Sequence, residues 1–432
     1  MTASYFIGER LIVPNLRFNP SSLAASHPNA RQGLRRYGPY DSQRLGKDKI
    51  SAALIYPNSL TSASQIVQQG LIQGNGVFRG FQSMFRIPIE FIAKRCATQE
   101  TENDLRRELQ AISGEKPDIV IFLTSTRNQH LYSAIKAESL GNGIPSQVIT
   151  AEKLQVQNQI QWTLENIALQ IYAKIGGTPW TVMSSSPQNK NELVLGFSRA
   201  LDRQRNFVVG FVTLFTHDGD YQLLYSLSPR PTEWSKLDEY RKALTELIVD
   251  AYREYSHQQG QPTSLVVHLC KRPGKYREIA AIEQALREIG NSIPYALVHL
   301  NDDSNYRLFD TSHPTYIPES GIKVTLSPSS ALLLLDGRQP DVPDGRSRKR
   351  GVPRVLEITM DRRSTMPVDQ FPRLVQQVFE FARVNWRGFN AQAIPATLNY
   401  SYLVARLVAE IGAQNWNAIA SSGVLRDKAW FL

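Results

Sequence analysis

Three polar side chains stand at helical spacing within residues 158–174, and their types suit the binding of a phosphate. Asn166, Gln170 and Lys174 follow one another at i, i+4 and i+8, so they project from one face of a helix. The opposite face is apolar and consists of Ile160, Leu164, Ile167, Ala168, Ile171 and Ile175. A lysine supplies positive charge and amides supply hydrogen-bond donors, which is the chemistry that a terminal phosphate needs.

Residues upstream of this stripe extend the pattern. Tyr132 and Lys136 are also four residues apart, and Gln147 follows in a turn after Pro145. Together the residues provide ammonium groups, amides and one aromatic ring, which favours a phosphate with a base stacked beside it. The alternative is that the stripe is the solvated face of an amphipathic helix, and the stripe taken by itself favours this alternative.

Apolar periodicity predicts the elements that must position these side chains. In the first half of the chain strands and helices alternate, with strands at 51–56, 85–91 and 118–123 and helices at 62–73, 101–113 and 158–174. This alternation predicts a doubly wound α/β domain, in which ligands bind at strand ends and helix N-termini. Gly176 and Gly177 end the last helix and indicate a domain junction.

The second half of the chain follows a different order. The expected elements are strands at 192–201, 207–215 and 221–226, a helix at 233–255, a strand at 264–270, a helix at 277–289 and a strand at 295–300. This order of three strands, helix, strand, helix and strand is typical of an RNase H-like fold. Helical patterns at 380–385 and 402–411 complete the domain.

Composition limits the class of protein. A chain of 432 residues suits two domains, and a net charge of +10, from 49 basic and 39 acidic residues, favours a polyanionic partner. The two cysteines, Cys96 and Cys270, support neither a disulfide framework nor a zinc site, so we expect a cytoplasmic protein. The longest apolar run, 331–335, ends at Asp336 and is far too short to span a membrane, so no membrane is expected.

Five short segments match the motifs of a known family. They are GLRRYGPYD at 33–41, IPSQ at 144–147, KIGGTPW at 174–180, NWRGF at 385–389 and WFL at 430–432. In this order they resemble a prokaryotic Argonaute of the short type, which has a MID domain and a PIWI domain only. The resemblance implies an N-terminal arm over 1–32, a Rossmann-like MID domain over 33–178 and an RNase H-like PIWI domain over 179–432.

The resemblance also implies a pocket for the 5′ end of a short nucleic-acid guide. Tyr132 would stack on the first guide base, and Lys136, Gln147 and Lys174 would hold the 5′-phosphate. Asn166 would lie at the edge of this pocket.

A divalent cation belongs to the same implied pocket. By the resemblance, Gln170 and the free carboxylate of Leu432 would ligate Mg²⁺ or another divalent cation that bridges to the guide phosphate.

The positions of the family's catalytic carboxylates hold other residue types. An RNase H-like nuclease needs clustered carboxylates to hold two divalent ions, whereas this sequence has Ser198, Cys270 and Tyr402 at the matching positions. A hydroxyl, a thiol and a phenol do not supply the required charge, so the expectation is a PIWI domain that is not an enzyme. The alternative that stays open is a guided nuclease with displaced metal ligands. Nearby carboxylates are Asp202, Asp218 and Asp220.

The resemblance implies partners as well. They are a guide RNA, with guide DNA as the alternative, a complementary target DNA, and an APAZ-containing effector protein with a sirtuin-like, TIR or nuclease domain. Target recognition would then signal to the effector in prokaryotic defence against plasmids or phage. A different class of function also stays open, because doubly wound domains often bind small molecules, and a small-molecule sensor is the competing hypothesis.

Overall fold

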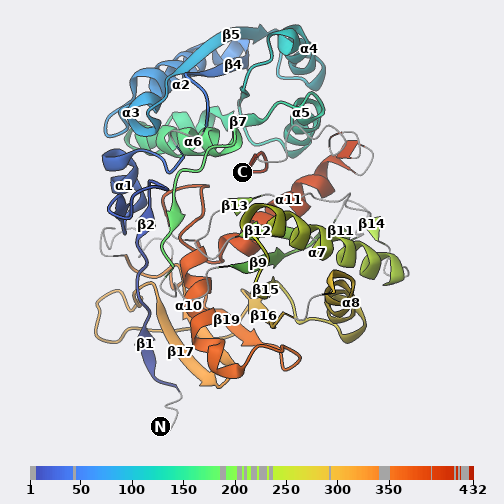
Figure 1. Cartoon of the computed structure of the whole chain (residues 1–432). Helices are drawn as coiled ribbons and strands as arrows, with labels where there is room; N and C mark the ends of the chain where they lie inside the picture. The colour runs from blue at the N-terminus through green and yellow to red at the C-terminus, as the bar shows by residue number, and fades with distance from the viewer. Residues whose placement is uncertain are drawn as a thin grey trace. The chain divides into compact units, whose positions relative to one another are not determined.

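The structure is a computed structural model, and it describes most of the chain (Figure 1). The described residues are 6–41, 45–184, 191–201, 207–208, 212–215, 221–222, 231–232, 237–290, 293–339, 351–390, 392–412, 415–416, 419 and 428–432. Their contacts define two compact units. We call them the four-stranded unit, made of Leu16–Trp180, Trp386–Phe389 and Leu407–Leu432, and the nine-stranded unit, made of Met1–Asn15, Thr181–Asn385 and Asn390–Arg406.

The four-stranded unit is built on a parallel sheet with the strand order β5-β4-β6-β7. The strands are β4 (Ile50–Pro57), β5 (Ile89–Ala97), β6 (Ile119–Thr124) and β7 (Ser146–Thr150). All six residues of β6 are buried, as are most of β4. Such continuous apolar strands form where helices cover both faces of a parallel sheet.

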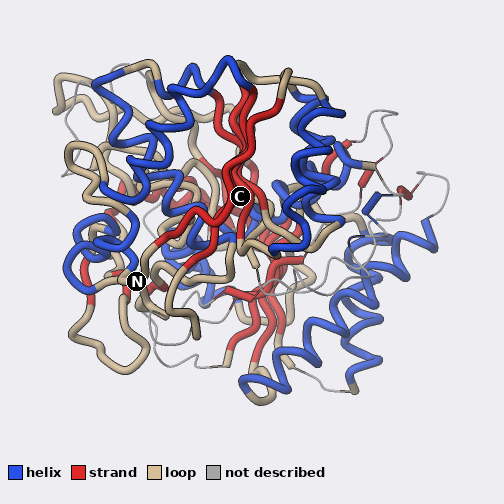
Figure 2. Tube along the Cα trace, turned by 90° about the horizontal axis from the view of Figure 1, so that it is seen from above, coloured by secondary structure: helices blue, strands red, loops and turns tan. Residues whose placement is uncertain are grey.

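Helices lie on both faces of this sheet (Figures 1 and 2). One face carries α2 (Thr61–Gln73), α3 (Phe81–Phe85) and α6 (Ile160–Lys174), and the other carries α4 (Glu102–Ile112) and α5 (Gln129–Gly141). A Cβ atom on Gly70 of α2 would lie 2.5 Å from Cδ1 of Leu164, so the close contact between α2 and α6 requires glycine there. The doubly wound prediction for this part of the chain is confirmed.

The nine-stranded unit has a mixed sheet with the order β1-β17-β18-β19-β16-β15-β9-β12-β13. Its strands are β1 (Gly8–Arg10), β9 (Glu192–Phe197), β12 (Val212–Phe215), β13 (Tyr221–Gln222), β15 (Ser264–Leu269), β16 (Tyr295–Asn301), β17 (Ile322–Ser327), β18 (Ser330–Leu334) and β19 (Leu356–Met360). Neighbours β9, β15 and β16 are parallel, whereas β12 is antiparallel to β9 and β13 to β12. An antiparallel meander followed by parallel crossovers confirms the RNase H-like prediction.

Helices cover both faces of the central strands β9 and β15. On one face α7 (Leu237–Gln259) and α8 (Ala280–Ile289) pack on Leu193, Leu195 and Val267. On the other face α11 (Ala396–Ile411) contacts His268, the neighbour of Val267, because Thr397 Oγ1 lies 2.9 Å from His268 Nδ1. Ser401 Oγ of the same helix donates to Gly196 O at 2.7 Å. This alternation of contacts follows from the two-residue period of a strand.

Shorter elements complete the two units. The four-stranded unit also contains β2 (Leu16–Arg17), β3 (Ser26–His27), α1 (Ala30–Tyr37) and 3₁₀ turns at Asn58–Leu60, Ser113–Glu115, Ala151–Leu154 and Gln157–Gln159. The nine-stranded unit also contains β8 (Thr181–Val182), β10 (Ala200–Leu201), β11 (Phe207–Val208), β14 (Pro231–Thr232), a π-helical turn at Lys275–Ile279, a 3₁₀ turn at Val368–Gln370 and α10 (Phe371–Phe381).

Three predicted elements differ from the structure. The segment 192–201 was expected to be one strand, but β9 ends at Phe197 and β10 begins at Ala200. The segment 85–91 was expected to be one strand, but α3 ends at Phe85, Arg86 takes a left-handed conformation with φ of 62°, and β5 begins only at Ile89. The expected helix at 380–385 is mostly wrong, because α10 starts at Phe371 and ends at Phe381. Short apolar runs do not distinguish a strand from a buried helical turn, and this ambiguity explains the error at 85–91.

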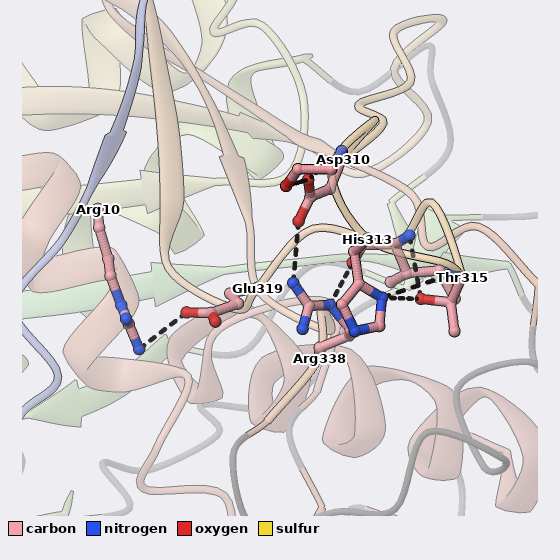
Figure 3. A network of polar contacts seen from close by, with 8 residues as sticks. Arg10, Asp310, His313, Thr315, Glu319 and Arg338 are labelled. Atoms are coloured by element: carbon pink, nitrogen blue, oxygen red, sulfur yellow. Dashed lines mark hydrogen bonds and ion pairs between the residues drawn. The ribbon is translucent and has the colours of Figure 1, made fainter.

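The N-terminal residues contribute an edge strand to the nine-stranded sheet. Strand β1 pairs antiparallel with β17, and Arg10 NH2 lies 2.9 Å from a carboxylate oxygen of Glu319. Figure 3 shows this ion pair beside a second one, in which Arg338 contacts Asp310 at 2.9 Å. These pairs fix the loop before β17 as well as the strand.

The two units defined by contacts divide the chain at other residues than the expected domains do. Residues 16–32 and 407–432 group with the four-stranded unit by contact. The functional boundaries 1–32, 33–178 and 179–432 stay a prediction.

Candidate functional site

Two buried lysines of the four-stranded unit end on one backbone carbonyl group. Lys136 of α5 and Lys174 of α6 are 0% and 1% exposed. Their Nζ atoms donate to Ser146 O at 2.6 Å and 3.1 Å respectively, and Lys174 also donates to Oε1 of Gln147 at 2.6 Å. The lysines therefore meet at the amino end of β7 and at the C-terminal turn of α6, so the site lies at a strand end, as expected, but not at a helix N-terminus.

The two ammonium groups lack a compensating charge. Within the described part of the chain, neither has a carboxylate oxygen within 4.0 Å. Burial lowers the pKa of Lys136 to about 8, although its hydrogen bond with Lys174 opposes this shift. Burial also lowers the pKa of Lys174 well below its usual value, and the charges of Lys136 and Arg387 add to that effect. An anion bound between these groups would favour the charged form of both lysines.

A buried carboxylate anchors the first half of α6. Glu165 is fully buried and accepts from Arg31 Nε at 2.7 Å and from Arg35 NH2 at 2.9 Å, so α1 is tied to α6. The Arg31 guanidinium also lies 4.6 Å from the ring centroid of Trp162 and 4.9 Å from that of Phe389. The Arg31 and Arg35 side chains are 26% and 43% exposed, so loss of one arginine should cost less than the about 3–5 kcal/mol that is typical of a fully buried pair.

A second buried carboxylate anchors the C-terminal half of α6. Asp41 accepts from the Tyr172 hydroxyl at 2.7 Å and from the Thr178 backbone N–H at 2.7 Å. Burial raises the pKa of Asp41, although these hydrogen bonds oppose the shift. The segment 33–41, noted in the sequence as a motif, thus lies next to α6 and fixes the helix end that carries Lys174.

The other two members of the polar stripe face residues 386–389. The amide nitrogen of Gln170 donates to Arg387 O at 2.8 Å, so its amide oxygen remains as an acceptor. The Oδ1 atom of Asn166 is buried and has no hydrogen-bond partner among the described residues. A Cβ atom on Gly388 would lie 3.1 Å from this oxygen, so glycine allows the close approach.

The last residues of the chain lie against the C-terminal turn of α6. Ala429 N donates to Ala173 O at 3.3 Å, and Leu432 N donates to Ala429 O at 3.1 Å. The Trp430 ring packs on Trp416 at 5.3 Å between centroids. Leu432 is buried, so its carboxylate is held in the same unit as Lys174 and Gln170.

The structure brings most of the predicted site residues together. Tyr132 lies one helical turn before Lys136, with its ring centroid 5.7 Å from the Lys136 Nζ atom, and Gln147 and Lys174 complete the group. Gln170 and Asn166 lie one and two turns back along α6. The interpretation of the stripe as a solvated face is wrong for Lys174, which is buried. The roles of these residues in guide binding stay predictions.

Several positioning residues of this site were missed by sequence reasoning. The Ser146 carbonyl, Glu165 and Arg387 received no role, although Arg387 belongs to the NWRGF segment and Arg35 to the GLRRYGPYD segment. The available signal for Glu165 was local, because an acidic residue stands between the apolar Leu164 and Ala168 of the predicted helix.

The positions matched to catalytic carboxylates lie in the nine-stranded unit. Parallel strands β9 and β15 end side by side, Cys270 N donates to Phe197 O at 3.3 Å, and Ser198 therefore lies near Cys270. Tyr402, 40% exposed, follows Ser401 on α11.

Only some of the carboxylates near Ser198 in the sequence belong to the described residues. Among the described residues, no three His, Cys, Asp or Glu side chains cluster so that they could hold a metal ion. Asp202, Asp218 and Asp220 lie outside the described residues.

Comparison with known proteins identifies the family. The Piwi domain family matches residues 118–416, which is more than half of the chain. The chain belongs to the Piwi domain family. Its sequence is 26% identical to an Argonaute protein of Cereibacter sphaeroides over 95% of this chain and 57% of that protein. It is 25% identical to a Piwi protein of Archaeoglobus fulgidus over 93% of each.

Solved structures of Piwi family members share the fold. Drosophila Piwi aligns with a TM-score of 0.70 at 16% identity and covers 98% of this chain and 56% of that chain. Clostridium butyricum Argonaute, solved with a guide DNA and a 19-mer target DNA, aligns with a TM-score of 0.69 at 16% identity, covering 94% and 53%. This chain therefore spans little more than half the length of these two proteins and of the Cereibacter sphaeroides relative.

None of the described helices is long and apolar enough to cross a bilayer.

The depressed pKa of Lys136 predicts that Lys136→Met stabilises the ligand-free protein. At pH 7 Lys136 is protonated in both the folded and the unfolded state, so the lowered pKa destabilises the folded protein in full. Removal of the charge, with the loss of one hydrogen bond, should therefore raise the free energy of unfolding by about 2–3 kcal/mol. Ser146 O would keep Lys174 as a donor. Since the folded pKa is about 8, the advantage of the variant should shrink as pH rises from about 8 toward the usual lysine pKa.

Urea denaturation at neutral pH and near pH 10 measures this difference. The matched control is Lys153→Met, because Lys153 is exposed and its replacement should change stability by less than about 0.5 kcal/mol. A Lys136→Met variant less stable than the parent protein at pH 7 would contradict the analysis.

Proposed function

We propose that this chain binds the 5′-phosphorylated end of a short guide in the four-stranded unit and uses the guide to recognise a complementary strand. The observation that carries the proposal is the pair of buried lysines, neither of which has a carboxylate oxygen within 4.0 Å among the described residues. A terminal phosphate carries close to two negative charges at neutral pH, which matches the charge that the pair lacks. An uncharged small molecule would leave the two lysines uncompensated, so a sensor of such molecules is disfavoured.

Each side chain of the proposed pocket has a distinct task. Lys136 and Lys174 supply charge-assisted hydrogen bonds to the phosphate, and Gln147 adds an amide donor once its nitrogen turns from Val148 O to the ligand. Tyr132 provides a flat surface for the first base. Asn166 contributes a buried oxygen without a partner among the described residues, which suits a donor on the ligand at the edge of the pocket.

The nature of the nucleic acids is proposed from family likeness. The solved Clostridium butyricum Argonaute holds a guide DNA and a target DNA. For this chain we propose a guide RNA and a target DNA, as the resemblance to short Argonautes implies, with guide DNA as the alternative. Sequence specificity would come from base pairing, while the protein recognises backbone shape and charge.

The residues present fit a divalent cation at the guide phosphate. The Gln170 amide oxygen is an acceptor outside the hydrogen bond to Arg387, and the Leu432 carboxylate is a hard anionic oxygen donor. When bound, Mg²⁺ or a similar cation would neutralise phosphate charge that the two lysines do not reach. The task of Gln170 is to hold its oxygen fixed, which its bond to Arg387 achieves.

We further propose that the chain does not cut the target and that it acts through a second protein. Ser198, Cys270 and Tyr402 supply no carboxylate at the positions where the family's nucleases hold metal ions. An APAZ-containing partner with a sirtuin-like, TIR or nuclease domain would then provide the output in defence against plasmids or phage.

Removal of the pocket lysines should abolish recognition of the guide phosphate. Each charge-assisted bond contributes about 1.5–3 kcal/mol, so Lys136→Ala and Lys174→Ala should each reduce the preference for 5′-phosphate over 5′-hydroxyl guides by roughly 10- to 100-fold. Filter binding with both guides measures this preference. Lys153→Ala, at an exposed position, should leave it unchanged. Equal preference in the parent protein and the double variant would refute the phosphate pocket, and no preference in either would favour the sensor hypothesis.

The carboxylate of Leu432 is tested by extension of the chain. A short Gly-Ser extension keeps the packed Trp430 ring and the Leu432 side chain but moves the terminal charge away. Guide affinity should fall by about tenfold or more, and its dependence on divalent cations should largely disappear. Leu432→Met is the matched control because it keeps the carboxylate in place. If the extended protein retains both affinity and cation dependence, Leu432 has no role in metal binding.

Target cleavage should be absent even after long incubation with guide, labelled target and Mg²⁺ or Mn²⁺. A product at one fixed guide position that disappears when a carboxylate of this chain is replaced would establish the displaced-ligand nuclease instead.

A further inference from the structure

A groove of about 850 Å³ follows one face of α2 in the four-stranded unit, and we call it the α2 groove. One wall is the helix itself, whose lining residues recur every three or four positions and include Ser59, Ser62, Ile66, Gln69, Gln73 and Asn75. The other wall is the connection from β7 to α6, through Ala151, Leu154, Gln155 and Ile160. The groove contains no residue of the lysine pocket, so it is a separate feature of the same unit.

The α2 groove is long. The same cavity is lined by Ser59, which precedes α2, and by Asn75, which follows it. The helix has 13 residues, so at a rise of 1.5 Å per residue the groove is about 20 Å long. An extended polypeptide rises about 3.3 Å per residue, so about six residues would fill this length. A compact small molecule would occupy only part of it.

The residues that line the α2 groove are uncharged throughout its described walls. Charged residues make up 20% of the chain, so a lining without any of them restricts the possible ligands. A phosphate or a carboxylate in the groove would lose its water without gaining a cation, and that loss is costly. The occupant is therefore expected to be uncharged, which disfavours nucleic acid here.

Side-chain amides stand on both walls of the α2 groove. Gln69, Gln73 and Asn75 belong to the helical wall and Gln155 to the opposite one, and all four are exposed. Their side chains form no hydrogen bond with another described residue. A primary amide has both donors and an acceptor, so it can pair with the N–H and C=O groups of a peptide main chain. A main chain that leaves water needs such partners.

We infer that the α2 groove binds an extended, uncharged segment of about six residues from a partner protein and that it recognises the main chain of this segment. The length of the groove, its lack of charge and its amides on both walls all match such a segment. An acyl chain would match the length and the lack of charge, but it would cover the amides without pairing with them.

An occupant of the α2 groove would also contact α6. Ile160, the first residue of α6, lines the groove, and Lys174 is the last residue of the same helix. Apolar lining residues, among them Ile66 and Leu154, offer surface to small aliphatic side chains of the segment. Main-chain hydrogen bonds would then provide affinity, and these apolar contacts would provide selectivity.

Methyl NMR of the whole chain tests the inference. Ile66 and Ile160 are reporters within the groove, and Ile135 of α5, on the opposite face of the sheet, is the control reporter. The probe is a pool of acetylated and amidated hexapeptides made of Ala, Val, Ser and Asn. It should shift the signals of Ile66 and Ile160 but not of Ile135, with half-saturation below about 1 mM. Two comparison pools, one with alternating Lys and Glu and one with N-methylated main chains, should each bind about tenfold more weakly or less.

A pair of matched variants locates the binding on the helical wall. Gln69→Glu with Gln73→Glu removes two amide donors and adds charge at exposed positions, so affinity for the uncharged pool should fall by about tenfold or more. Gln65→Glu with Gln68→Glu makes the same changes on α2 outside the groove lining, and it should keep the affinity of the parent protein. Both variants leave the lysine pocket intact, so the result does not depend on guide binding.

Four results would overturn the inference. They are no shift of the two groove reporters up to about 1 mM of the uncharged pool, equal binding of either comparison pool, an unchanged affinity in the groove variant, and an equal loss in the control variant. Equal binding of the N-methylated pool would show that the main chain is not recognised.

Discussion

The organisation of the four-stranded unit depends on two ammonium groups that share one carbonyl oxygen away from water. Lys136 and Lys174 are buried at Ser146 with no carboxylate nearby among the described residues. Burial disfavours the charged form of both side chains. The contacts around α5 and α6 offset this cost in the ligand-free protein, and a bound anion would relieve it.

Helix α6 receives that support at both ends. Near its start, Arg31 and Arg35 bind the buried Glu165, and near its end Asp41 binds Tyr172 and Thr178. All of these partners come from α1 and the residues after it, which explains why a motif at 33–41 accompanies a site formed by α5, β7 and α6. The C-terminal residues add a third contact through Ala173. The helix is therefore fixed against rotation, and its polar stripe keeps one orientation.

Local sequence patterns predicted the helical faces and the order of elements, because these features depend on local geometry. The spacing of Asn166, Gln170 and Lys174 predicted one helical face, and the alternation of segments predicted both the parallel sheet and the RNase H-like order. The partners of Glu165 lie 130 and 134 residues away along the chain, and such contacts leave no periodicity to recognise. For the same reason the Ser146 carbonyl was missed, because every residue carries a carbonyl and only the fold decides which one accepts two lysines. The prediction for segment 85–91 was wrong for a local reason, because Arg86 adopts a left-handed conformation that ends α3 within an apolar run.

Buried and exposed cations of this chain differ in how they would interact with an anion. The buried Lys136 and Lys174 are desolvated before any ligand arrives, so a bound phosphate gains their interaction without stripping their water. Such groups discriminate between a charged and an uncharged ligand end. Arg272 and Lys275 are exposed, and their interactions with a polyanion are screened by salt and weak individually. Under the proposed function, exposed cations of this kind would add affinity for a nucleic-acid backbone without selecting a sequence. The buried lysines would instead set the end of the guide, because their interaction depends on the charge of the ligand end.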